Sequence, residues 1–395
     1  MEIIDWEQHG MGYEAGKLEG VLQPVARAKG LPNEHYIDQA TFDAEREAVF
    51  FANWAAVGFG KDVPEEADAK PFDFLGLPLL MVRGRDGIVR VFQNTCRHRG
   101  MILVSEPKKM RGVIRCPYHS WCYDLEGRLK TTPHVGGPGQ NTHEDIDRDT
   151  LGLIEIRSHV WQDVVFVNMS GEAEPFETYA AAMLERWKEF EQPAYFGGAD
   201  SEFELEVKSN WKLAVENNCE SYHLPWVHPG LNSYSKLEDH YHIIEHGHYS
   251  GQGTMVYDPS LSREQAFSNF KGLSKKWEKQ AEYLSFFPNL LLGVHRDHRF
   301  AIILVPDGPE HTTERLALYY ADQRMIGDDY AGLREKNREL WKEVFVEDIG
   351  VVEGMQAGRH GRYFDGGKFS PTMDEPTWVF HHWIASQLTA KQTST

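Results

Sequence analysis

The sequence predicts an α+β protein, in which an all-β domain precedes a domain built from an antiparallel sheet and a long C-terminal helix. From Trp54 to about Val167, apolar runs of strand length alternate with turn sequences. Beyond this region strand patterns alternate with helical ones, and the longest helical pattern covers residues 333–356. We therefore expect an N-terminal helical segment packed on the body of the protein, a β domain and a second domain, at residues 1–50, 51–167 and 168–395.

Length and composition exclude several classes of protein. A chain of 395 residues is too long for one ordinary hydrophobic core, so two domains are expected. The net charge of -19 argues against nucleic acid as a partner, because phosphate binding needs an excess of Lys and Arg. No apolar run approaches the roughly 20 residues of a membrane span, and residues 1–5 lack the pattern of a signal peptide. Four cysteines do not suggest a disulfide framework, so we expect reduced thiols and a cytoplasmic location.

The N-terminal segment contains one helical pattern, at residues 38–53. Phe42, Val49 and Phe50 share a face at positions i, i+7 and i+8. Arg46 interrupts that face, although its aliphatic stem can lie along it. We expect this helix to pack on the β domain that follows it and to lead the chain into that domain.

The β domain is predicted from six short runs and two turn signals. Asp86-Gly87 and Glu126-Gly127 are typical of hairpin turns. The runs that we interpret as strands are WAAVGF, LPLLMVR, IVRVFQN, GVIRCP, WCYDLEG and VVFVNM.

Two Cys/His pairs lie in this domain and give the strongest chemical signal in the chain. Cys96 and His98 are followed, after residues 99–115, by Cys116 and His119. Each pair offers a thiolate and an imidazole from a short loop, as expected for a [2Fe-2S] centre with two Cys on one iron and two His on the other. A structural zinc site and two unrelated pairs remain as alternatives, although common zinc fingers group two Cys in one half and two His in the other.

The two loops, CRHRG and CPYHSWCYDLEGRL, resemble the cluster-binding loops of Rieske domains in non-haem iron oxygenases. Rieske proteins of respiratory complexes carry an extra Cys in each loop, where this sequence has Met101 and Tyr118. The resemblance therefore implies the oxygenase type, in which the cluster feeds electrons to an oxygen-activating iron. Cys122 is interpreted as a buried packing thiol.

A second motif, NWKLAVENNCESYHLPWVH, begins at Asn210 and ends at His228. It predicts a helix over residues 210–224, which would place Glu220 and His223 one turn apart so that they project together. Pro225 is expected to end that helix and to let His228 turn back toward His223. With a carboxylate from elsewhere in the chain, two imidazoles would complete a 2-His-1-carboxylate Fe(II) site, which leaves positions open for dioxygen and substrate.

This motif is similar to the iron-binding segment of Rieske oxygenase α subunits, within the aromatic-ring-hydroxylating dioxygenase superfamily. The resemblance implies that His223 and His228 bind the iron. It also implies that Glu220 is an electron-transfer bridge from a mononuclear-site His to His119 or His98 of a neighbouring subunit. Ring-hydroxylating dioxygenases usually have Asp at the bridge position, whereas Glu resembles the choline, carnitine and glycine-betaine monooxygenases.

The remaining patterns predict the body of the second domain. Residues 175–192 form an amphipathic helical pattern. Residues 283–305 predict two antiparallel strands with a turn near Arg296-Asp297, and LALYYA predicts another strand. Together with the C-terminal helix, the sheet resembles the helix-grip catalytic domain of the family. Five residues of this region have two equally favoured interpretations, as cavity lining or as sheet core: Phe286, Phe287, Leu291, His295 and Phe300.

The helix over residues 333–356 contains the acidic candidates for the third ligand. Its sequence resembles the family segment E-D-x-x-x-x-E-x-x-Q-x-G, which places the ligand at Asp348. Glu343 is better interpreted as a solvated helical charge, and the same interpretation is open for Glu347.

The resemblance implies the terminal component of a Rieske-type oxygenase with a [2Fe-2S] cluster, a mononuclear Fe(II) and O2 as co-substrate. It implies a head-to-tail homotrimer, and a separate flavin/iron-sulfur reductase that supplies electrons from NAD(P)H, since no nicotinamide or flavin motif is found. The expected substrate is a small quaternary ammonium compound, which is hydroxylated or oxidatively N-demethylated. Aromatic residues able to form a cation-π cage support this, such as Tyr222, Trp226, Phe286 and Phe287.

Two other functions are considered. One is ring hydroxylation of an aromatic acid or another aromatic compound, for which His295 and Arg296 are the candidate substrate contacts. The other is a Rieske electron carrier without catalysis, and the second iron motif argues against it.

Overall fold

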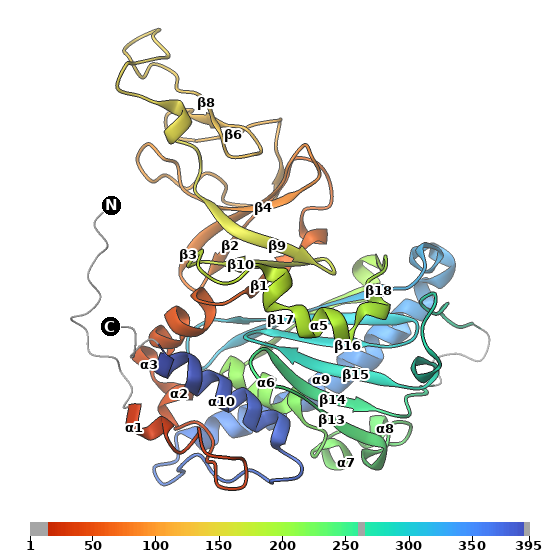
Figure 1. Cartoon of the computed structure of the whole chain (residues 1–395). Coiled ribbons are helices and arrows are strands. Elements are labelled where there is room, and N and C mark those ends of the chain that lie inside the picture. Colours follow the sequence, from red (N-terminus) through yellow and green to blue (C-terminus); the bar gives the residue numbers. More distant parts are fainter. Residues whose placement is uncertain (1–14, 260–264, 391–395) are drawn as a thin grey trace. The chain divides into compact units, whose positions relative to one another are not determined.

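The computed structural model describes residues 15–259 and 265–390 (Figure 1), so the first 14 residues of the predicted N-terminal segment lie outside it. The chain divides into two compact units. One is Ala56–Ala173, and the other combines Met1–Ala55 with Glu174–Thr395. The predicted α+β class is confirmed. None of the helices in the described ranges combines the length and the apolar character that crossing a bilayer requires.

The smaller unit is a β domain with a seven-stranded sheet, in the order β1-β10-β9-β4-β3-β2-β5. All six predicted runs form strands. The strands β2 and β9 were not predicted, because their residues are mostly half-exposed and carry no apolar pattern. The bounds are β1 Ala55–Phe59, β2 Asp68–Phe74, β3 Leu77–Arg83, β4 Val89–Gln93, β5 Lys108–Lys109, β9 Glu155–Trp161 and β10 Val164–Asn168.

A smaller sheet, β6-β7-β8, carries the second Cys/His loop. Its strands are Ile114–Arg115, Cys122–Tyr123 and Leu129–Thr131. Both predicted turns are confirmed: Gly87 joins β3 to β4 and Gly127 joins β7 to β8, each with a positive φ. Such backbone conformations are readily adopted by glycine. Cys122 is buried and its thiol donates to the Ser120 carbonyl, as expected of a packing residue.

The N-terminal helices belong to the larger unit. They are α1 (Ala15–Leu18), α2 (Glu34–Ile37) and α3 (Gln39–Glu45), and α3 continues as a π-helical turn over Arg46–Phe51. The Nζ of Lys212 lies 2.6 Å from a Glu45 carboxylate oxygen, and both side chains are fully buried. Tyr36 also donates to Glu216. A buried charge requires a partner. The partners of Glu45 and Tyr36 are Lys212 and Glu216, which belong to the motif at residues 210–228 and not to the β domain.

The larger unit is built on an eight-stranded antiparallel sheet in the order β11-β18-β17-β16-β15-β14-β13, with β12 also paired to β18. The region predicted as two strands contains three, because a Pro288-Asn289 turn separates two apolar runs. The bounds are β11 Tyr195–Phe196, β12 Glu202–Val207, β13 His240–Glu245, β14 Tyr249–Thr254, β15 Ala281–Phe286, β16 Leu290–Val294, β17 His298–Pro306 and β18 Thr312–Tyr320.

Helices cover both faces of this sheet (Figure 1). The predicted helix at 175–192 is broken near Ala180, and the long predicted helix is confirmed as α9. The bounds are α4 Phe176–Tyr179, α5 Ala181–Arg186, α6 Trp211–Cys219, α7 Leu224–Val227, α8 Pro229–Asn232, α9 Ala331–Arg359 and α10 Glu375–Ala390.

Strand alternation decides which side chains face α6 and α9. On β15, Ser285 accepts from Asn218 of α6, whereas its neighbour Phe286 packs against Tyr179 of α4. Successive side chains point to opposite faces of a sheet. Through the antiparallel register, the face that carries Ser285 continues through Leu291 of β16 to Ile302 of β17. This face forms one wall of the site.

Candidate functional site: two metal centres

The first Cys/His cluster forms where the loop after β4 meets the loop between β6 and β7. Cys96 and Cys116 are buried, and their thiols interact. Burial raises the pKa of the Cys96 thiol, although the Tyr123 hydroxyl lies 3.3 Å from its sulfur. The rings of His98 and His119 lie 4.7 Å apart, nearer the surface. The structure thus arranges the four residues as a Cys pair and a His pair.

These pairs fit a two-iron cluster better than a single zinc ion. A zinc site needs all four ligand atoms around one point. Among the residues that the structure describes, the one such convergent group of three or more metal-binding side chains lies elsewhere, in the larger unit. The Nδ1 of His119 is buried without a hydrogen-bond partner within the described residues. A buried polar atom of this kind requires a partner, and iron of a [2Fe-2S] cluster would supply it.

The convergent group is His223, His228 and Asp348, whose ligand atoms all lie within 4.8 Å of one another. The Nε2 atoms of His223 and His228 lie 3.7 and 3.0 Å from the Asp348 Oδ1. Asp348 comes from the middle of α9, and the two histidines come from the chain that follows α6. Two imidazoles and one carboxylate are the donor set of a mononuclear non-haem Fe(II) site with open positions.

The local structure around the histidines differs from the predicted helix. The helix α6 ends at Cys219, and Glu220 is extended, with φ -127° and ψ 160°. Glu220 and His223 meet through a turn, because a Glu220 carboxylate oxygen accepts the backbone N–H groups of Tyr222 and His223. Pro225 lies in the first turn of α7 and does not end a helix. Proline is well suited to that position because it has no N–H to leave unpaired.

A shell of carboxylates and one amide orients the three side chains. The Nδ1 of His223 lies 2.7 Å from Glu220, and the Nδ1 of His228 lies 2.7 Å from Glu347. Asn217 donates to the Asp348 Oδ1 at 3.1 Å. Carboxylates that hold the outer nitrogen of a ligating histidine are typical of metal sites, because they fix the tautomer and the ring orientation.

The interpretation of Glu347 as a solvated charge was wrong, because its carboxylate holds the Nδ1 of His228. Its role could not be deduced from the sequence, because its partner is 119 residues away in the chain. Burial disfavours the charged form of His228, but Asp348 and Glu347 outweigh this effect and raise its pKa. Asn217 was also missed, although it lies within the predicted motif.

We expect replacement of Glu347 by Gln to weaken metal binding at this site by roughly 10- to 100-fold, the usual effect of losing such an orienting partner. Titration of the metal-depleted protein with Fe(II) under anaerobic conditions measures this change. The matched control is Glu343→Gln, which removes an exposed carboxylate one turn away on the same helix. Equal affinities of the two variants would show that Glu347 does not support His228.

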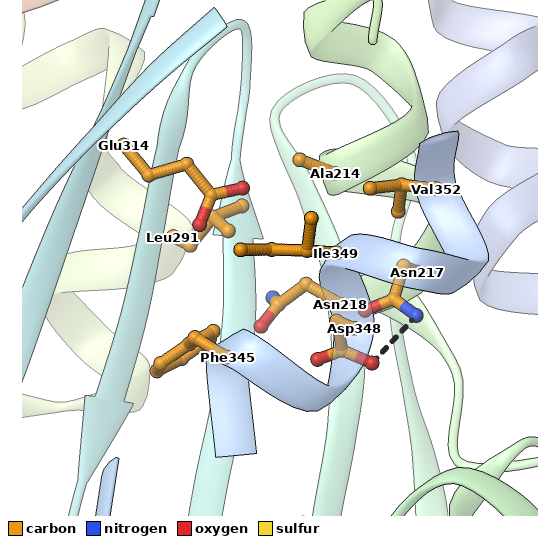
Figure 2. Close-up of a pocket in the computed structure, with 9 residues that line it drawn as sticks. All are labelled: Ala214, Asn217, Asn218, Leu291, Glu314, Phe345, Asp348, Ile349 and Val352. Carbon is orange, nitrogen blue, oxygen red and sulfur yellow. Dashed lines mark hydrogen bonds between the residues drawn. The ribbon is translucent and has the colours of Figure 1, made fainter. Parts of the chain in front are cut away.

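A small pocket with a cavity volume of about 10 Å³ adjoins Asp348 between α6, α9 and the sheet (Figure 2). Most of its wall is apolar. The lining residues are Ala214, Asn217, Asn218, Leu291, Glu314, Phe345, Asp348, Ile349 and Val352. Apolar walls with few polar groups are typical of small-molecule sites. Leu291 is therefore a cavity residue, one of the two interpretations left open for it.

None of the four aromatic residues suggested for a cation-π cage lines this pocket. Tyr222 and Trp226 are 44% and 71% exposed. Phe286 faces α4, and Phe287 packs against Phe380 and Trp383 of α10. Alternation along β15 places Phe286 on the far face of the sheet.

A different aromatic group leads away from the pocket along α9. Phe345 is in the pocket wall, and its ring lies 5.7 Å from Phe300 and 6.2 Å from Trp341. Tyr283 and Tyr257 lie 5.9 and 6.1 Å from Trp341. We call these five residues the aromatic row. Phe345 and Trp341 precede Asp348 by one and two helical turns, so they share its face of α9.

The two residues considered for binding an aromatic acid lie elsewhere. His295 and Arg296 line a second pocket together with Tyr257 and Trp277. Burial lowers the pKa of His295 well below its ordinary value. Arg296 donates to the Glu278 carbonyl. Neither residue lines the pocket beside Asp348.

Comparison with known protein families gives two matches. Residues 53–144 match the Rieske [2Fe-2S] domain, and residues 184–390 match the ring hydroxylating alpha subunit (catalytic domain). The chain is 30% identical over 401 residues to the glycine betaine monooxygenase oxygenase subunit of Chromohalobacter salexigens, covering 91% of this chain and 86% of that protein. It is 27% identical over 340 residues to the carnitine monooxygenase oxygenase subunit of Escherichia coli (strain K12), covering 85% and 86%.

Solved structures share the fold. A quaternary ammonium Rieske monooxygenase in complex with L-carnitine superposes with a TM-score of 0.73 at 23% identity, covering 93% of this chain and 98% of that chain. Naphthalene 1,2-dioxygenase from Rhodococcus sp. gives a TM-score of 0.70 at 16% identity, covering 91% and 93%.

Proposed function

Because the chain belongs to the ring-hydroxylating alpha subunit family of Rieske oxygenases, we propose that it is a terminal oxygenase that oxidises a small quaternary ammonium compound. The family uses a Rieske [2Fe-2S] cluster, a mononuclear iron and O2. The observation that carries the proposal is the pocket beside His223, His228 and Asp348, whose wall includes Phe345, the first residue of the aromatic row. Aromatic faces attract quaternary ammonium groups through cation-π interactions.

The proposed metal ligands follow from the geometry. Cys96, Cys116, His98 and His119 would hold the cluster, and His223, His228 and Asp348 would hold the iron. The two centres supply the redox chemistry, namely electron storage at the cluster and dioxygen activation at the iron.

The surrounding residues prepare the site. Glu220 and Glu347 accept from the Nδ1 atoms of the two histidines and direct each Nε2 toward Asp348. Leu291, Phe345 and Ile349 give the pocket an apolar wall, which favours the substrate's methyl groups over water. A methyl group held beside Asp348 would be hydroxylated, and a hydroxymethyl group on nitrogen is released as formaldehyde, which completes N-demethylation.

We further propose that electrons reach the iron from the cluster of a neighbouring subunit in a head-to-tail homotrimer, with Glu220 as the bridge. Exposed apolar side chains lie near both ends of this electron route, the cluster and Glu220. Met101 and Tyr118 lie in or beside the cluster loops, and Tyr222 and Trp226 lie beside Glu220. Exposed apolar groups of this kind are typical of protein interfaces. A separate reductase would deliver electrons from NAD(P)H.

The substrate class is tested by oxygen uptake of the iron-loaded protein with a generic reductase and NADH. Glycine betaine, carnitine, choline and proline betaine are compared with benzoate and phenylpropionate. The proposal predicts uptake with an ammonium compound, together with formaldehyde or aldehyde release. Uptake with the aromatic acids alone would contradict it and would establish the ring-hydroxylating alternative.

A further inference from the structure

One acidic side chain, Glu314, lies in the apolar part of the pocket wall. It belongs to β18, and the register pairs it with Leu304 of β17, on the sheet face that looks toward α6 and α9. Figure 2 shows its carboxyl group pointing from the strand toward Leu291 and Ile349. Only 7% of the residue is exposed.

Among the residues that the structure describes, none compensates the carboxyl of Glu314. Within the described ranges, the structure gives it neither a hydrogen bond nor a salt bridge, and none of the nine pocket-lining residues is basic. The two amides of the pocket are engaged elsewhere, since Asn217 donates to Asp348 and Asn218 donates to Ser285. Burial, reinforced by the negative charge of Asp348, raises the pKa of Glu314 to about 8.

An unpaired acid in a buried pocket wall lowers the stability of the folded state, because burying a charge or an unsatisfied polar group without a partner is unfavourable. Costly buried acids in a pocket indicate a functional role. Ordinary structural carboxylates in this chain are compensated: Glu282, on the other face of the sheet, accepts from Arg186 and Trp187.

We propose that Glu314 is the counter-charge that selects a cationic substrate in the pocket beside Asp348. A quaternary ammonium group has no N–H to donate, so a protein can recognise it only by its charge and by contact with its methyl groups. Leu291, Phe345 and Ile349 supply the apolar contact. A cation bound beside Glu314 favours the ionised carboxyl and so lowers its pKa from about 8, and Glu314 then supplies the opposite charge. A carboxylate kept free of hydrogen-bond donors is suited to such a ligand. The inference rests on the proposed function and adds a specificity-determining residue to it.

The test compares each quaternary ammonium compound with a carbon analogue of the same shape that lacks the positive charge. Glycine betaine is paired with 3,3-dimethylbutanoate, and choline is paired with 3,3-dimethylbutan-1-ol, so that a carbon replaces the charged nitrogen. Dissociation constants are measured by anaerobic calorimetry on the iron-loaded holoenzyme, and KM and kcat by oxygen uptake. The variants are Glu314→Gln, which keeps the shape, and Glu314→Asp, which keeps the charge.

We expect Glu314→Gln to reduce the preference for each ammonium compound over its carbon analogue by about tenfold or more, through weaker binding of the ammonium group. Glu314→Asp should retain part of that preference. The matched control is Glu206→Gln, which removes an exposed carboxylate from the neighbouring strand β12. Thermal unfolding of Glu314→Gln should begin no lower than that of the wild type, because no partner loses a bond.

Two results would overturn the inference, and they differ in whether the proposed function survives. If the wild type oxidises a quaternary ammonium compound but Glu314→Gln keeps its full preference for the cation, as Glu206→Gln does, Glu314 is not the counter-charge and the proposed function stands. If the wild type neither binds nor oxidises any of the ammonium compounds, the proposed function and the role of Glu314 both fail.

Discussion

Replacing Glu220 by Gln should leave both iron centres in place and lower turnover by roughly 100-fold. The Glu220 Oε1 lies 2.7 Å from His223 Nδ1. A carboxylate has two acceptor oxygens and can receive an N–H from His223 and another from a cluster histidine of a neighbouring subunit, whereas an amide has only one acceptor oxygen. The substitution therefore breaks the proposed electron route without removing a metal ligand.

The measurement separates electron transfer from the other steps. The cluster is reduced anaerobically, the protein is mixed with oxygen and substrate, and reoxidation of the cluster is followed by its visible absorption. Fe(II) is supplied in excess, because Glu220 also orients His223 and its replacement weakens iron binding as that of Glu347 does. In the iron-saturated Glu220→Gln protein reoxidation should be slow, while substrate affinity stays at the wild-type value. Glu220→Asp restores the carboxylate and should recover part of the rate. Glu238→Gln, a change at an exposed position, is the control. Wild-type turnover in Glu220→Gln would contradict the proposed electron route.

Replacing Asp348 by Ala should abolish turnover by removing the mononuclear iron. Asp348 is the one carboxylate in the convergent group, and its Oδ1 lies 3.0 Å from His228 Nε2. Two imidazoles alone hold Fe(II) poorly, because the hard, anionic oxygen ligand is gone. Iron content should fall from about three to about two atoms per chain, since the [2Fe-2S] cluster remains.

Iron analysis and the visible spectrum of the cluster, measured on the same sample, check this prediction. The spectrum should be unchanged, because the cluster ligands belong to the other compact unit. Glu343→Ala, at an exposed position of the same helix, should keep both the iron and the activity. If Asp348→Ala retained its third iron and its turnover, the third ligand would be another acidic residue of α9.

The sequence predicted those parts of the site that depend on short segments. The Cys/His loops could be found because each contributes two potential ligands within four residues, and the structure brings the two loops together. The α9 segment was found through its resemblance to a family motif. In contrast, the contact between Glu347 and His228 depends on how α9 packs against the turn after α6, and no local pattern encodes that packing.

The pocket was predicted less well, for a physical reason. Phe286 and Leu291 are both apolar residues of one β hairpin, but the register places them on opposite faces of the sheet. A shift of one residue in the strand pattern exchanges the two faces, so the sequence left both interpretations open. Glu314 gave no signal either, because an acid within a strand is ordinarily exposed, as Glu204 is.

In the mechanism that we propose, the cluster of one chain reduces the iron of another through Glu220, and mixed oligomers test this electron route most directly. Chains with Cys116→Ala, which lack the cluster, are assembled with Asp348→Ala chains, which lack the iron, and oligomers that contain both are isolated with two affinity tags. Each variant alone should be inactive, and the mixture should regain turnover. Adding Glu220→Gln to the Cys116→Ala chain should abolish the regained activity, whereas adding it to the Asp348→Ala chain should not. Mixed oligomers that form but stay inactive would contradict electron transfer between subunits.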